Sequence, residues 1–96
     1  MTLDEFRATL TAPKPLSTWP AALRALWLDA SGDWDAAHGL VDDPADAIET
    51  RVHAYLHRKE GDPSNARYWY AQAGVKPWSG ALEREWESLV RELLGA

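Results

Sequence analysis

The stretch Ala25-Leu-Trp-Leu-Asp-Ala-Ser-Gly-Asp-Trp-Asp-Ala-Ala37 decides the fold, because residues 54–66, AYLHRKEGDPSNA, repeat its plan. In both stretches an Ala stands seven residues before a Gly-Asp pair, and a second Ala stands five residues after that Gly. A Gly-Asp pair ends one helix and caps the next, while the small alanines let two helices approach closely. The pairs begin at Gly32 and Gly61, an offset of 29 residues that is typical of helical repeats.

Helix signals continue on both sides of these stretches, and no segment reads clearly as a strand. Short connections between consecutive helices favour antiparallel neighbours. The sequence therefore predicts an all-α stack of about five to six antiparallel helices, forming one domain over residues 1–96. The expected helix starts are Thr2, Ser17 or Thr18, Asp33, Asp43, Asp62 and Ser79.

Six tryptophans in so short a chain are expected mainly to fill the core. The last helix, expected over residues 80–95, carries an apolar stripe that includes Trp86. Its other side, which includes Glu85, is expected to face solvent.

The order of small, aromatic and turn residues in the second unit resembles a tetratricopeptide repeat. The residues that carry this likeness are Ala54, Gly61, Asp62, Ala66, Tyr70 and Ala73, with His57 where the repeat has an aromatic residue. The phrases GDWDAAH over residues 32–38 and HAYLHR over residues 53–58 are also similar to a group of small uncharacterised bacterial proteins with tetratricopeptide-like folds. The resemblance implies a short right-handed helical repeat with a core over about 20–77, and with residues 2–11 and 80–95 as capping helices. It implies no activity.

Composition excludes several classes of function. Ten Lys and Arg against fifteen Asp and Glu give a net charge of −5, which argues against a nucleic-acid partner. The absence of cysteine excludes disulfides and thiolate metal sites. No apolar run reaches the length of a membrane span, and the first twenty residues lack the apolar core of a signal peptide. We therefore expect a soluble cytoplasmic protein without membrane contact.

All three histidines of the chain fall within twenty residues, at His38, His53 and His57. His53 and His57 share a helix face, with Glu49 one turn before and Glu60 three residues after. Two histidines at this spacing can bind zinc when a third imidazole or a carboxylate completes the ligand set, which makes His38, His53, His57 and Glu49 candidate ligands. Two other interpretations remain open at this point: a hydrogen-bonded helix flank and a small polar binding pocket.

Chemistry-bearing motifs are otherwise scarce, because the chain has neither a nucleophile elbow nor a Gly-rich phosphate loop. The sequence therefore predicts a non-catalytic module that binds a protein or peptide and needs no cofactor. Arginine beside tyrosine and tryptophan is typical of interface hot spots. The residues expected at the partner surface are His38, His53, His57, Arg58, Tyr68 and Trp69. The alternative is a metal- or small-ligand-binding protein, with or without enzyme activity, centred on the histidines; a homo-oligomer is a further possibility.

Overall fold

Six α-helices and one 3₁₀ turn make up the part of the chain that the computed structural model describes, residues 1–95. Over these residues there is no strand, which confirms the predicted all-α class. The elements are α1 (Leu3–Ala8), η1 (Thr9–Thr11), α2 (Ala21–Ala30), α3 (Trp34–Val41), α4 (Ala47–Glu60), α5 (Pro63–Ala73) and α6 (Leu82–Leu94).

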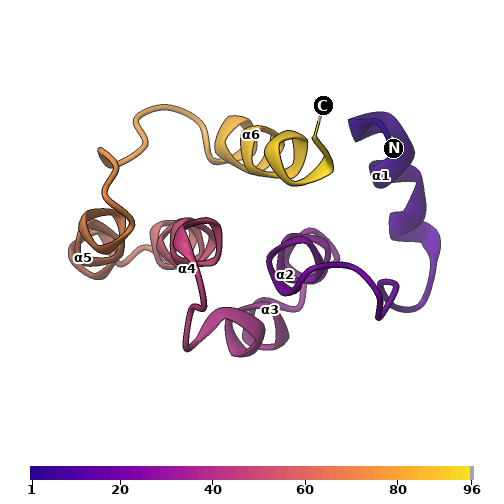
Figure 1. Cartoon of the computed structure of the whole chain (residues 1–96), viewed down its shortest axis with the longest axis horizontal. Helices are drawn as coiled ribbons and strands as arrows, with labels where there is room; N and C mark the ends of the chain where they lie inside the picture. The colour runs from indigo at the N-terminus through magenta and orange to yellow at the C-terminus, as the bar shows by residue number, and fades with distance from the viewer. Residues whose placement is uncertain (96) are drawn as a thin grey trace.

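The helices pair in chain order before the last one folds back. Helices α2 and α3 form one hairpin, and α4 and α5 form a second that packs beside it. In Figure 1, α2, α4 and α5 are seen nearly end-on in one row, with α3 on one side of the row and α6 on the other. Helix α6 contacts α1, α2 and α4, so the first and last helices pack together.

The two Gly-Asp corners have the same backbone geometry. Gly32 and Gly61 adopt φ values of 94° and 91°, in the left-handed region that glycine enters without steric strain. Asp33 and Asp62 follow with φ, ψ of −109°, 75° and −113°, 76°. Each Asp side chain accepts a hydrogen bond from the backbone N–H three residues later, at 3.1 and 3.2 Å. The repeated sequence pattern thus corresponds to a repeated local structure.

The fourth helix begins later than predicted. Asp46, rather than Asp43, caps α4 by accepting a 2.9 Å hydrogen bond from the Glu49 N–H. Asp42 at the end of α3 is still in helical conformation, with φ −60° and ψ −36°. Asp43 consequently falls in the connection, where it cannot start a new helix.

Two further cap predictions are wrong. Helix α2 begins after Pro20 and α6 begins after Ala81, and neither start has a side-chain cap. Ser17, Thr18 and Ser79 lie in the preceding connections. Thr2, by contrast, caps α1 as predicted, because its hydroxyl accepts from the Glu5 N–H while the Glu5 carboxylate accepts from the Thr2 N–H.

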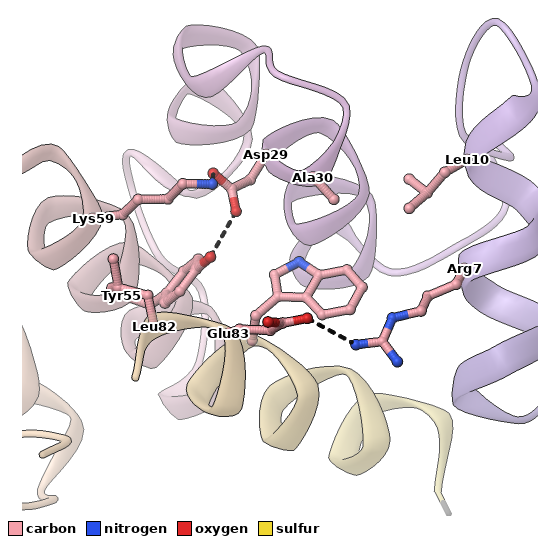
Figure 2. A pocket seen from close by; sticks show the side chains of 9 residues that line it. Arg7, Leu10, Asp29, Ala30, Tyr55, Lys59, Leu82 and Glu83 are labelled. Carbon is pink, nitrogen blue, oxygen red and sulfur yellow. Dashed lines mark hydrogen bonds and ion pairs between the residues drawn. The ribbon is translucent and has the colours of Figure 1, made fainter. Parts of the chain in front are cut away.

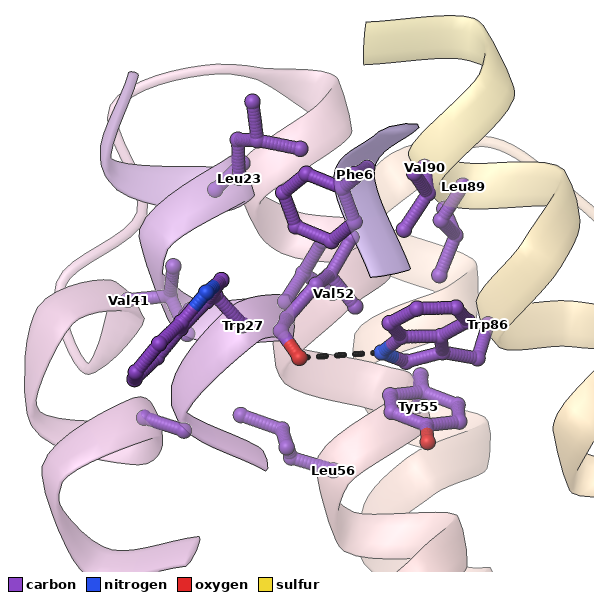
Figure 3. Close-up of a cluster of buried hydrophobic side chains, with 14 of the residues drawn as sticks. Phe6, Leu23, Trp27, Val41, Val52, Tyr55, Leu56, Trp86, Leu89 and Val90 are labelled. Atoms are coloured by element: carbon purple, nitrogen blue, oxygen red, sulfur yellow. Dashed lines mark hydrogen bonds between the residues drawn. The ribbon is translucent and has the colours of Figure 1, made fainter. Parts of the chain in front are cut away.

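The main core lies where α1, α2, α4 and α6 meet (Figure 3). Trp86 of α6 is buried there and donates its indole N–H to the Leu26 carbonyl of α2, at 2.9 Å. Phe6 of α1 packs against the rings of both Trp19 and Trp86. The alanines that flank the two corners are also buried: Ala25, Ala37, Ala54 and Ala66.

Glu85 is buried rather than solvated, which corrects the sequence prediction for this face of α6. Only 3% of the residue is exposed. Its carboxylate accepts a hydrogen bond from the Tyr70 hydroxyl and pairs with Arg58 at 3.1 Å. Desolvation raises the pKa of Glu85, and the bonds from Tyr70 and Arg58 act in the opposite direction. These contacts join α4, α5 and α6.

Across residues 1–95, no helix combines the length and the apolar character that crossing a bilayer requires.

Candidate metal centre

The three histidines converge on one point between α3 and α4. The Nε2 atom of His53 lies 3.3 Å from Nε2 of His38 and 2.8 Å from Nε2 of His57. Each of the three rings offers a nitrogen within 4.8 Å of the other two. The predicted imidazole cluster is therefore present, with its three ring nitrogens close enough together to share one ion.

Local sequence explains how the rings are brought together. His53 and His57 stand one turn apart on α4 and share its face toward α3, so their rings are neighbours. His38 reaches them from α3, because the connection over residues 42–46 turns the chain back along α4. His53 and His57 are 2% and 7% exposed, whereas the His38 side chain is 23% exposed and forms the rim.

In both buried rings, Nδ1 is the outer nitrogen, and its hydrogen bond fixes the ring so that Nε2 points inward. His53 Nδ1 donates to the carbonyl of Val41 at 2.8 Å, and His57 Nδ1 donates to the Glu60 carboxylate, also at 2.8 Å. The side-chain amide of Asn65 lies farther from the same His57 atom, at 3.4 Å. A neutral imidazole has one donor and one acceptor nitrogen, so both Nε2 atoms present lone pairs.

Two lone pairs that face each other at 2.8 Å repel unless something positive lies between them. A shared proton or a metal ion meets that need. The outer hydrogen bonds are also the kind that orient metal-ligating histidines, in which a carbonyl or carboxylate holds the distal nitrogen. The arrangement thus favours a positive charge, a proton or a metal ion, between the two rings.

Two tryptophans form the walls of the cluster. The indole of Trp34 stacks on the His38 ring with a centroid distance of 4.9 Å and an interplanar angle of 8°. Trp69 stacks on His53 at 4.1 Å and 22°. The Trp34 indole N–H donates to the Leu56 carbonyl at 2.8 Å, which attaches the wall on α3 to α4.

Burial disfavours protonation of the central ring. Desolvation lowers the pKa of His53, and the adjacent His57 and His38 lower it further. The Val41 carbonyl and the Asp42 carboxylate act in the opposite direction. Because a metal binds the unprotonated imidazole, a lowered pKa favours the ligand form at neutral pH.

Of the two carboxylates predicted beside the histidines, one lies there and one does not. Glu49 is turned to the start of α4, where it accepts from the Ala45 N–H at 3.2 Å, so the structure does not bring it to the histidines. Glu60 supports His57 from outside the cluster. Asp42, which sequence reasoning missed, lies 3.7 Å from His38 Nε2 with a side chain that is 70% exposed. Its i, i+4 spacing from His38 was the signal that could have identified it.

A second potential ligand group overlaps the first. His57, Glu60 and Asp62 also bring three ligand atoms within 4.8 Å of one another. Asp62, however, is already engaged in capping α5. The imidazole triad is the better metal site because none of its Nε2 atoms is needed for a helix cap.

Of the remaining residues of the predicted partner surface, Arg58 lies apart from the histidines, whereas Trp69 adjoins them and Tyr68 adjoins Trp69. Arg58 pairs with Glu85 and donates to the Gly80 carbonyl, which places it in the contact between α4 and α6. Trp69 is partly buried against His53. Tyr68 is 56% exposed and meets Trp69 edge-on, with centroids 5.1 Å apart.

In comparisons with known proteins, the chain matches no family model, no curated protein and no solved structure. The likeness to tetratricopeptide repeats stays a prediction from the sequence.

Proposed function

We propose that the protein binds a divalent transition-metal ion, with zinc as the best match, through the Nε2 atoms of His38, His53 and His57. The observation that carries the proposal is the 2.8 Å approach of two inward lone pairs, on His53 and His57, whose outer nitrogens are both occupied as donors. Neutral imidazoles suit zinc, copper and nickel better than calcium or magnesium, which prefer oxygen.

The distances support a tetrahedral ion with few adjustments. Two nitrogens bound to zinc at 2.0–2.1 Å and at a tetrahedral angle are about 3.3 Å apart. The His38–His53 pair already has that separation, and the His53–His57 pair needs to open by roughly half an ångström. The exposed carboxylate of Asp42 adds negative charge at the rim, beside His38.

Competition of the protein with a chromophoric zinc chelator tests the proposal, with Co²⁺ absorption as a second readout of the ligand field. We expect one zinc ion per chain. In His38→Gln or His57→Gln, we expect the affinity to fall more than 100-fold, because even outer-shell partners of a metal ligand contribute about 10–100-fold. Glu60→Gln, which alters only the hydrogen bond to His57, is expected to fall in that smaller range.

Asp62→Asn is the matched control, because asparagine caps a helix as well as aspartate does but offers no carboxylate to a metal. Zinc affinity in this variant should equal that of the wild type. If His38→Gln binds zinc as tightly as the wild type while Asp62→Asn loses binding, the ion occupies the overlapping carboxylate group and our assignment is wrong. Absence of stoichiometric binding at micromolar zinc overturns it altogether.

Binding of a peptide or protein is the second proposal, and the exposed Tyr68 ring standing against Trp69 supports it. Aromatic side chains of this kind anchor many interfaces. Crosslinked partners of the wild type should be lost in Tyr68→Ala, and unchanged partners in that variant count against the surface.

A further inference from the structure

A cavity of about 440 Å³ lies on the side of α4 opposite to the histidines. It opens between α1, α2, α4 and α6, and Figure 2 shows the side chains that line it. Most of the wall is apolar, and it includes the Trp86 ring. Its size falls in the range of small-molecule sites, roughly 300–1,000 Å³. The apolar lining residues are Leu10, Ala30, Leu82 and Trp86.

One end of this cavity holds a buried carboxylate. The Asp29 side chain is 2% exposed, and it accepts a hydrogen bond from the Tyr55 hydroxyl at 2.8 Å. Its other oxygen has no hydrogen bond but lies 2.9 Å from the ammonium of Lys59. A carboxylate removed from water needs a cation beside it, because desolvation penalises an isolated charge heavily.

The Lys59 ammonium, which is the cation beside Asp29, is not held rigidly. The Lys59 side chain is 39% exposed, and a four-carbon stem lets its ammonium reach water. Tyr55 is fixed by contrast, because burial and the Asp29 charge raise its pKa and keep the hydroxyl a donor. An ammonium group from outside can therefore replace Lys59 without disturbing the Tyr55–Asp29 hydrogen bond.

At the opposite end, the cationic side chain is already paired with carboxylates. Arg7 is bound to Glu87 at 2.6 Å and lies 3.5 Å from Glu83. Its guanidinium also lies 5.6 Å from the centre of the Trp86 ring. The chain as a whole carries a net charge of −5, which attracts cations and repels anions.

We infer that this cavity binds a protonated primary amine with an apolar body. The ammonium takes the place of the Lys59 ammonium against Asp29, and the body lies on Trp86 and Leu10. A buried carboxylate suits the ammonium, and the apolar wall gains by excluding water from the ligand's body.

Two variants with opposite expected effects test the inference, with 2-phenylethylamine as the probe and zinc absent. Binding is measured by isothermal titration calorimetry and by shifts of the Trp86 indole N–H signal in NMR. Asp29→Asn removes the charge that holds the ammonium, and should weaken binding about tenfold or more. Lys59→Gln removes the internal competitor, and should strengthen binding several-fold. If the Asp29–Lys59 pair had a purely structural role, both substitutions would change the affinity for the amine in the same direction.

Ala30→Leu, which fills the cavity from an exposed position, should weaken amine binding without altering the polar end. Ala71→Leu, also exposed but on α5, is the matched control and should bind as the wild type does. The anion 3-phenylpropionate has nearly the same body and should not bind. The inference is overturned if this anion binds more tightly than the amine, if Ala30→Leu has no effect, or if neither probe shifts the Trp86 signal at millimolar concentration.

Discussion

The buried histidines and Asp29 each have two polar atoms, and the hydrogen bond at one of them sets the direction in which the other points. His53 and His57 point Nε2 inward because Nδ1 is used by Val41 and Glu60. Asp29 at the other site is held in the same manner, since one oxygen accepts from Tyr55 and the other faces a cation. Both proposed sites thus rest on a buried polar group with one partner fixed and one replaceable.

Two buried tyrosines predict how stability responds to alkaline pH. Burial and a neighbouring carboxylate raise the pKa of Tyr55 and Tyr70 in the folded state. The unfolded chain ionises these phenols near pH 10. Stability from the neutral phenols is therefore complete below that pH and is lost as the pH rises through and above it. Urea unfolding between pH 8 and pH 11 should show a smaller loss in Tyr55→Phe and in Tyr70→Phe than in the wild type.

Tyr68→Phe is the control for this measurement, because its exposed ring is outside the core. This variant should follow the wild-type curve. An equal reduction of the alkaline loss in all three variants would contradict the assignment of the effect to buried phenols.

Sequence reasoning identified some residues of the metal centre and missed others. His53 and His57 are identifiable because helical spacing alone makes them neighbours, and His38 follows once the helices are paired. The Val41 carbonyl is backbone and carries no sequence signal. Glu49 has the same helical spacing from His53 as His57 has, but its carboxylate accepts from the Ala45 N–H in front of the start of α4 instead.

Where two helices are joined by a short Gly-Asp corner, the local sequence determines where one helix ends and the next begins. The Gly-Asp corners were predictable because glycine provides the left-handed residue and aspartate the cap within two positions. After a longer connection these rules do not locate the next helix, since its start depends on where the previous helix ends. Asp46 replaces Asp43 for this reason, and α6 begins without any polar cap.

The cap of α4 can be tested directly because the chain supplies both candidates. Asp46→Ala removes a hydrogen bond to the Glu49 N–H and should lower the free energy of unfolding by about 1 kcal/mol. Asp43→Ala should change it by less than about 0.5 kcal/mol, since surface substitutions away from such features have small effects. Chemical denaturation of both variants gives the comparison, and equal losses would be inconsistent with a cap at Asp46.

At the scale of the whole molecule, α6 and α1 close the helical stack. Helix α6 covers α2 and α4, and α1 completes the core by inserting Phe6 between Trp19 and Trp86. The terminal helices were predicted as caps from the resemblance to a short helical repeat. Their contact with each other was not, because pairing between segments 80 residues apart leaves no periodic signal, as the Arg7–Glu87 bond shows.

Substitution of Phe6 measures how much the packing of α1 on the core contributes to stability. The ring is fully buried, so Phe6→Ala should lower the free energy of unfolding by about 3–5 kcal/mol. Far-UV and near-UV circular dichroism should report one shared transition, because α1 belongs to the common core. Leu16→Ala, at a side chain 58% exposed, is the control and should have little effect. A separate early transition for α1 would show that it is not part of the cooperative unit.

The indoles that flank the histidine cluster have a thermodynamic consequence. Trp34 and Trp69 lie flat against two of the imidazoles, and Val41 and Glu60 hold the outer nitrogens. The rings therefore have little rotational freedom left to surrender when an ion arrives. Ordering a side chain on binding commonly costs about 0.5–1.5 kcal/mol of binding free energy. Here that ordering takes place during folding instead. The empty and occupied forms should accordingly be nearly superimposable, with the ion received by a preorganised receptor.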